Sequence, residues 1–147
     1  DTVHEAPTRD HGAYGLLWRG FPSYQWSPPG PVLQWLKTKH SAYGREGRVK
    51  VSAPEVASPQ ALVFVTYSGP HTGINEALPA GKVAGQFFEH LGIRVLDEVY
   101  VVGEFHGNEE ASTKGRLGDI RGRPTEDDLR AVSERAAALV RRLEALR

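Results

Sequence analysis

The chain has 147 residues, about the size of one domain with a buried core, and its 18 lysines and arginines balance its 18 aspartates and glutamates. This balance gives no reason to expect a nucleic acid or an anionic membrane as a partner, and the absence of cysteine excludes disulfides, thiolate metal sites and cysteine nucleophiles. No apolar stretch reaches the roughly 18 residues of a membrane span. Because small secreted domains often need disulfides, the lack of cysteine favours a cytoplasmic protein, and the length predicts that residues 1–147 form a single domain. The chain begins at Asp1 and contains no methionine, and we therefore expect a processed chain or a fragment of a longer one.

The first part of the chain predicts one strand and one helix, with a proline-rich loop between them. Residues 1–12 are polar and indicate a loop, whereas residues 14–21 (YGLLWRGF) predict a short strand. The loop over residues 22–31 holds four prolines and two large aromatic residues, and a helix is expected over residues 31–37, because proline is tolerated in a first helical turn. Residues 38–60 are polar and dotted with glycine and proline, which predicts an exposed, mobile connection.

The most informative stretch is residues 61–77. It opens with the unbroken apolar run of residues 61–65, which is typical of a strand covered on both faces by helices in a parallel sheet. The run gives way to small and hydroxylic residues with two glycines over residues 66–73, and a helical pattern follows. In an open α/β sheet, a loop that leaves the C-terminal end of a strand and enters a helix is where ligands bind. We therefore expect the ligand-binding loop of the chain here.

Two further elements follow this loop. A helix is expected from Glu76 or Pro79 to Leu91, where apolar residues recur at helical spacing, and Gly92 is well placed to end it. Residues 93–102 predict a strand, and residues 103–123 a long loop rich in glycine and charge.

The last helix has the clearest pattern of all. Thr125 can cap it with Asp128 three residues on, and Pro124 keeps the preceding chain out of the helix. One apolar stripe runs along it, opposite a charged face: Leu129, Val132, Ala136, Leu139, Val140, Leu143 and Leu146. Strands that alternate with helices predict an α/β domain with a mainly parallel sheet.

Three segments of the chain together resemble the flavodoxin-like family of FMN-binding proteins. Residues 20–32 (GFPSYQWSPPGPV) are similar to the third strand and flavin loop of that family, and residues 64–73 (FVTYSGPHTG) to its fourth strand and second flavin loop. Residues 122–129 (GRPTEDDL) are similar to the start of its last helix. The resemblance covers the chain from about residue 14 onward. It implies a flavodoxin-like three-layer α/β/α sandwich with FMN at the C-terminal edge of the sheet.

The same resemblance implies that the sheet is N-terminally incomplete. In the family, a loop after the first strand cradles the FMN phosphate, and this chain has no such loop before Gly20. On this alignment the first strand, the phosphate loop, the first helix and most of the second strand are missing. The strand over residues 14–21 would then have one unpaired edge.

The residues that the resemblance places at the flavin come from the first two loops. Tyr24 or Trp26 would cover one face of the ring and Tyr67 the other, while Ser23 and Ser68 would hydrogen-bond its pyrimidine edge. The full expected set is Pro22, Ser23, Tyr24, Gln25, Trp26, Thr66, Tyr67, Ser68, Gly69, His71 and Gly73. The alternative is that the aromatic residues serve only in packing, which is the interpretation we favour for Trp35 within the predicted helix.

Three other interpretations stay open. Residues 68–76 vaguely resemble a phosphate loop themselves, with Ser68, Thr72 and Asn75 as donors. His71 and His106 lie at the same predicted sheet edge, where they would contact substrate, act as acid/base groups or be plain loop residues; no ligand spacing supports a metal site. The charged residues of the predicted loop 103–123 form either a solvated surface or a docking site for a redox partner or a pyridine-nucleotide phosphate.

The expected function is FMN-dependent electron transfer, or NAD(P)H-dependent reduction by an FMN enzyme. The partners would be a flavin together with NAD(P)H or a redox partner protein, and the sequence assigns no catalytic residue. The alternative is a flavin-free interaction or structural domain that keeps the scaffold without a phosphate site.

Overall fold

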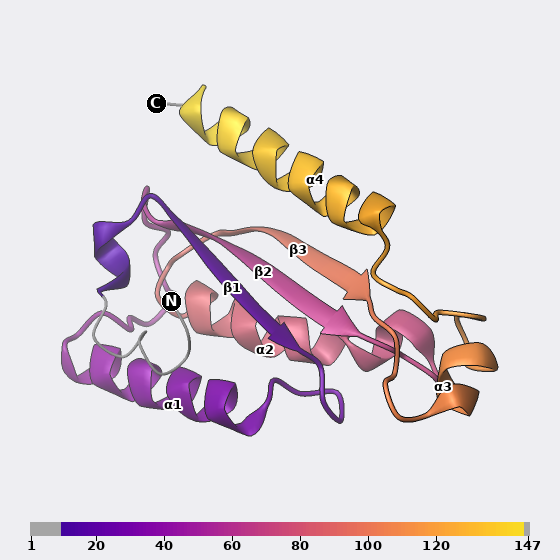
Figure 1. Cartoon of the computed structure of the whole chain (residues 1–147). Coiled ribbons are helices and arrows are strands. Elements are labelled where there is room, and N and C mark those ends of the chain that lie inside the picture. The colour runs from indigo at the N-terminus through magenta and orange to yellow at the C-terminus, as the bar shows by residue number, and fades with distance from the viewer. Residues whose placement is uncertain (1–9, 146–147) are drawn as a thin grey trace.

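The computed structural model describes residues 10–145 and contains one sheet of three parallel strands (Figure 1). The strands are β1 (Leu16–Pro22), β2 (Gln60–Tyr67) and β3 (Val95–Val102), and β2 lies between the other two. All three strands therefore end at the same edge of the sheet. This arrangement confirms the predicted α/β class and the parallel sheet.

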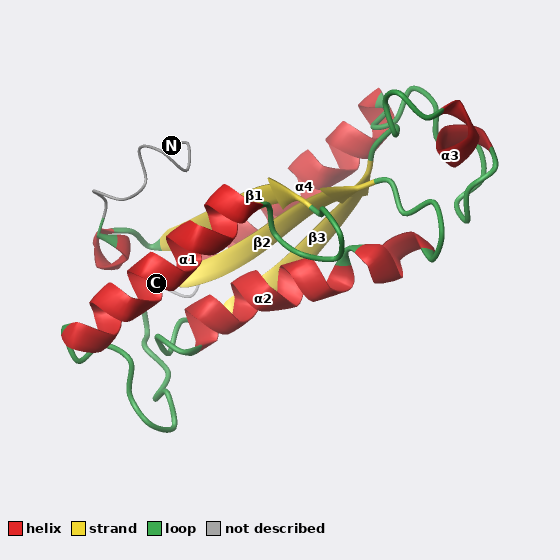
Figure 2. Cartoon of the chain, turned by 90° about the horizontal axis from the view of Figure 1, so that it is seen from below, coloured by secondary structure: helices red, strands yellow, loops and turns green. Residues whose placement is uncertain are grey.

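Helices cover both faces of the sheet and make three layers. Helices α1 (Gly30–Arg45) and α2 (Leu78–Glu89) lie side by side against one face, and α4 (Glu126–Glu144) crosses the opposite face (Figures 1 and 2). The short helix α3 (Glu109–Thr113) lies beyond the end of β3. None of the helices within residues 10–145 is both long and apolar enough to cross a lipid bilayer.

The central strand is buried on both faces, as its unbroken apolar run predicts. Ala61, Val63 and Val65 pack against α1 and α2 in the larger core, and Leu62 contributes to a smaller cluster on the α4 side. Strand β1 pairs with β2 from Leu16 opposite Gln60 onward. Its other edge pairs with no strand among residues 10–145, in agreement with the expected unpaired edge.

Helix α1 is longer than the sequence pattern indicates. It continues to Arg45, so residues 38–45 are helical and the prediction of an exposed connection over them was wrong. Tyr43 is the reason, because its ring is buried in the main core nearly two helical turns beyond the predicted end. Helix α3 likewise interrupts the predicted loop over residues 103–123, and the Asn108 side chain caps its first turn by accepting from the Ala111 N–H.

Helix α4 has the predicted capping box but a less buried stripe than expected. The Thr125 hydroxyl accepts from the Asp128 N–H, and the Asp128 carboxylate accepts from the Thr125 N–H. Val132 and Leu139 pack on the smaller cluster, whereas Leu129 stays 48% exposed. Leu146 and residues 1–9 lie outside the described residues.

Candidate functional site

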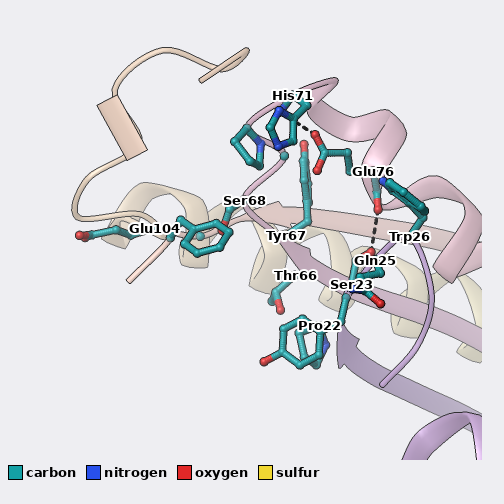
Figure 3. Close-up of a pocket in the computed structure, with 15 residues that line it drawn as sticks. Pro22, Ser23, Gln25, Trp26, Thr66, Tyr67, Ser68, His71, Glu76 and Glu104 are labelled. Atoms are coloured by element: carbon teal, nitrogen blue, oxygen red, sulfur yellow. Dashed lines mark hydrogen bonds between the residues drawn. The ribbon is translucent and has the colours of Figure 1, made fainter. Parts of the chain in front are cut away.

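A pocket of about 760 Å³ opens at the C-terminal ends of the three strands. It is formed by the loops that follow β1 and β2 and by the first residues after β3 (Figure 3). Ten of the eleven residues predicted to bind a ligand line it: Pro22, Ser23, Tyr24, Gln25, Trp26, Thr66, Tyr67, Ser68, Gly69 and His71. The structure therefore brings together two segments that lie some forty residues apart in the sequence.

The eleventh predicted residue, Gly73, lies behind the loop and shapes it. Its N–H donates to the Gly69 carbonyl over 3.0 Å, and a side chain at Gly69 would meet the Gly73 carbonyl oxygen at 2.5 Å. Both residues have a positive φ, which glycine adopts without strain. The two glycines thus close the turn that carries Ser68 and His71 to the pocket wall.

The loop after β1 holds its two aromatic residues on a strained turn. Tyr24 and Ser27 exchange two backbone hydrogen bonds of 3.0 Å, and the two residues between them, Gln25 and Trp26, have φ values of 48° and 62°. Such a turn normally takes Asn-Gly, and a positive φ is unfavourable for a bulky residue. Backbone strain of this kind gathers at functional sites. The turn keeps the Trp26 ring 63% exposed at the pocket rim.

Tyr67 forms the opposite part of the wall at the end of β2. Its side chain rises from the strand toward His71 and Glu76 (Figure 3). Burial raises the pKa of the Tyr67 hydroxyl, so it stays protonated and remains a hydrogen-bond donor. The side chains of Tyr24 and Trp26 are largely exposed, whereas Tyr67 is partly buried and packs against the main core on one side.

Glu76 organises the two loops, and sequence reasoning gave it no role. One carboxylate oxygen of Glu76 accepts from the N–H groups of His71 and Thr72, over 2.7 and 2.6 Å. The Glu76 carbonyl accepts from the Ser23 hydroxyl over 2.7 Å, which ties the loop after β1 to the loop after β2 (Figure 3). The sequence feature that could have pointed to Glu76 is an acidic residue shortly after a turn with two glycines. The backbone N–H groups of such a turn form a concave anion-binding site, called a nest, which a carboxylate can occupy.

The Glu76 contacts also bear on the alternative phosphate-loop interpretation of residues 68–76. Two of the N–H groups that would hold a phosphate are bound to a carboxylate of the same chain. The proposed donors Thr72 and Asn75 do not line the pocket. The arrangement therefore favours a loop that is closed by its own acid.

The segment after β3 adds Gly103, Glu104 and Phe105 to the wall, and the half-exposed Phe105 ring adds apolar surface. Glu104 is drawn away from the pocket centre, because its carboxylate accepts from the Gly122 N–H over 2.8 Å (Figure 3). The exposed His106 ring lies 3.9 Å from the same carboxylate, while His71 belongs to the other loop. Among residues 10–145, no three His, Cys, Asp or Glu side chains are grouped to hold a metal ion.

Few charged residues line the pocket. Its described lining includes Glu76 and Glu104 and no lysine or arginine, although the positive charge of Arg123, outside the lining, acts on the Tyr67 hydroxyl. In the loop that follows, charges pair with one another: Asp119 binds Arg121, and Lys114 lies 3.7 Å from Glu110. Arg121 lowers the pKa of Asp119 to about 2 by hydrogen bonding to its carboxylate.

Trp35 is a packing residue, as the sequence pattern favoured. It is buried in the main core, and the guanidinium of Arg19 lies 3.8 Å from the centre of its ring. It therefore takes no part in the pocket.

Comparison of the chain with models of known protein families and with curated proteins finds no match. The function must therefore be argued from the chemistry of the pocket.

Proposed function

We propose that this pocket binds the isoalloxazine ring of a flavin, with FMN as the cofactor of a flavodoxin-like α/β/α domain. The activity would be FMN-dependent electron transfer or NAD(P)H-dependent reduction. One observation carries the proposal: the predicted residues of two separate loops converge on one pocket at the C-terminal edge of a parallel sheet. This edge is where open α/β sheets bind their ligands.

The residue types of the pocket suit a flat, largely apolar heterocycle with a polar rim. Tyr24, Trp26 and Tyr67 offer aromatic side chains, and each stacked pair contributes roughly 0.5–1.5 kcal/mol. The hydroxyls of Thr66 and Ser68 can satisfy the carbonyl and N–H groups of a pyrimidine edge. A bound flavin would supply one- and two-electron redox chemistry, and the protein would orient the ring and shield it from water. The carboxylate of Glu76, in the pocket wall, would disfavour a negative charge on the ring.

A titration with FMN, followed by quenching of flavin fluorescence, tests the proposal. We expect saturable binding by the wild type. Trp26→Ala should weaken binding about tenfold through the loss of one stacking partner, which corresponds to about 1.4 kcal/mol. Trp18→Ala is the matched control, because Trp18 is a half-exposed tryptophan on β1 outside the pocket. Absence of saturable binding by the wild type would refute the proposal.

A second measurement distinguishes an electron carrier from a reductase. A reductase oxidises NADPH or NADH in the presence of FMN and a quinone, whereas a carrier only exchanges electrons with a chemical reductant. The rate of NAD(P)H oxidation by the flavin-loaded chain therefore separates the two activities.

The second candidate function is a flavin-free interaction domain. It is favoured by the open sheet face beside α4, where Trp18 is 49% exposed and Leu129 is also exposed. Apolar surface of this kind marks contact sites. This candidate gains support if the chain binds no flavin and its association with itself or with another protein is lost in Trp18→Lys.

A further inference from the structure

We infer that the pocket recognises the ring of the flavin and not its phosphate, so that this chain binds lumiflavin and riboflavin about as tightly as FMN. This inference rests on the proposed function, since it names the part of the flavin that the same pocket holds. It follows from three properties of the pocket: its backbone donors, its charges and its helix ends.

Three consecutive backbone donors of the ligand loop, at His71, Thr72 and Gly73, are already engaged. The N–H groups of His71 and Thr72 both point at the Glu76 carboxylate, at 2.7 and 2.6 Å, and the Gly73 N–H donates to the Gly69 carbonyl. A phosphate would have to displace Glu76 from two charge-assisted hydrogen bonds and then lie beside the displaced acid. The loop is thus built around an anion of its own.

No opposite charge compensates for this. The charged residues of the described lining are Glu76 and Glu104, and the lining holds no lysine or arginine. The stem of Arg116 lies near Gly73, and the Arg123 guanidinium, whose positive charge reaches the Tyr67 hydroxyl, is paired with Asp128. A dianionic phosphate near this wall would therefore meet repulsion.

The helix N-termini do not open on the pocket either. Helices α1 and α2 begin at Gly30 and Leu78, and neither residue lines the cavity. Both helices carry proline in their first turn, at Pro31 and Pro79, which removes one N–H group from each end. The usual helix-end site for a phosphate is therefore not part of this pocket.

What the pocket does offer suits an uncharged ring. The aromatic side chains of Tyr24, Trp26 and Tyr67 and the hydroxyls of Thr66 and Ser68 all belong to its lining. None of these groups requires a negative charge on the ligand. The ring system is common to lumiflavin, riboflavin and FMN, so it should set the affinity of all three.

The test compares the three flavins on the same chain. We expect dissociation constants that agree within about threefold and change little with added salt, because no ion pair with the ligand is formed. An affinity for FMN about tenfold or more above that for riboflavin, with the advantage falling as salt is added, would overturn this inference and leave the proposed function in place. Failure of all three flavins to bind would instead overturn the proposed function, and this inference with it.

Two variants of Glu76 test the step on which the inference depends. Glu76→Ala frees the N–H groups of His71 and Thr72 and removes a negative charge. The affinity for FMN relative to the affinity for riboflavin should therefore rise about threefold or more. Glu76→Gln keeps an oxygen that can accept from the loop N–H groups, so it should raise the ratio of FMN affinity to riboflavin affinity less than Glu76→Ala does. Circular dichroism verifies that both variants fold. An FMN-to-riboflavin ratio that stays at the wild-type value in folded Glu76→Ala would overturn the assignment of Glu76 as the group that keeps phosphate from the loop.

Discussion

Trp26 combines a left-handed backbone with a largely exposed ring, although bulky residues rarely adopt that conformation. A turn chosen for stability alone would have glycine at this position. The neighbouring Gln25 shares the positive φ, so the strain extends over both central residues of the turn. The simplest physical account is that the turn is kept for the ring that it presents at the pocket rim.

Trp26→Gly is therefore expected to stabilise the protein while it impairs binding. Glycine relieves the backbone strain, and the gain in unfolding free energy should reach up to about 1 kcal/mol. Flavin affinity should fall about tenfold, as for Trp26→Ala. Urea unfolding and flavin titration measure the two effects. Trp26→Ala is the control: it removes the ring and keeps the strain, so equal stability of the Ala and Gly variants would contradict the account.

His11 is a second residue with an unusual setting. It is 4% exposed and lies among the rings of Trp35, Tyr43 and Phe87. Burial, and then the positive charge of Arg19, lower the pKa of His11 to about 4 from its ordinary value of 6.5. The imidazole is therefore neutral in the folded protein over most of the pH range in which a free histidine would be charged.

This setting predicts a loss of stability in acid. Because the folded-state pKa is the lower one, the unfolded chain binds the proton more readily, and the protein becomes less stable as the pH falls from about 6.5 to about 4. The loss should be at most about 3 kcal/mol, and it should be absent above about pH 7. Urea midpoints across this range measure it. His11→Phe should remove this part of the pH dependence, and an unchanged slope in that variant would contradict the assignment.

At the scale of elements, the packing of α2 on the sheet depends on small residues. Ala80, Gly81 and Ala84 are buried on the face of α2 that meets the strands. A side-chain carbon at Gly81 would lie 2.1 Å from the Tyr100 hydroxyl oxygen, which donates to Glu98 over 2.7 Å. The close approach of helix and strand thus leaves no room for a methyl group.

Gly81→Ala should destabilise the protein by about 1–3 kcal/mol, although alanine is the better helix former. Gly44→Ala provides the matched control in α1, where nothing lies within 4 Å of the added carbon, and it should stabilise by about 0.5 kcal/mol. Thermal or urea unfolding measures both. Tyr100→Phe removes the nearest clashing atom and should restore part of the stability of Gly81→Ala. If both glycine variants shifted stability in the same direction, the packing argument would fail.

Element positions were predictable from the sequence where the apolar pattern is strong, as in β2, α2 and α4. The end of α1 could not be predicted in this way. The residues around Tyr43 are mostly polar, and the contact of Tyr43 with the core forms only when the helix packs on the sheet. For the pocket, the sequence indicated which loops contribute. It did not indicate the role of Glu76, since that role depends on where two backbone N–H groups meet after folding.

At the scale of the whole molecule, the two faces of the sheet are covered to different extents. On the α1 and α2 side, aromatic and aliphatic residues form a continuous core. On the α4 side, three buried residues form the smaller cluster, and α4 is tied to β3 by the ion pair of Arg135 with Asp97. The face of β1 that carries Trp18 remains half exposed, next to an edge that pairs with no strand in residues 10–145.

An exposed parallel edge favours association between chains. We expect the protein to self-associate with rising concentration, and Trp18→Lys to reduce this association with a change in unfolding free energy within about 0.5 kcal/mol. Sedimentation velocity at several concentrations measures the effect. Val51→Lys is the control, because Val51 is 97% exposed in the connection between α1 and β2 and not on a strand. Equal association of the two variants would show that β1 is not the contact.

The three tryptophans of the chain lie in different environments, so their intrinsic fluorescence can report on different processes. Trp35 is buried under Arg19 and should emit at the blue side of the spectrum until the core unfolds. Trp26 lies exposed at the pocket and should emit at the red side, where a bound flavin would quench it by energy transfer. Trp18, on the open edge, should be shielded from a soluble quencher such as acrylamide when chains associate. Unfolding should therefore shift the emission wavelength of Trp35, ligand binding should lower the emission intensity of Trp26, and self-association should reduce the quenching of Trp18 by acrylamide. All three are measured by intrinsic fluorescence without any added label.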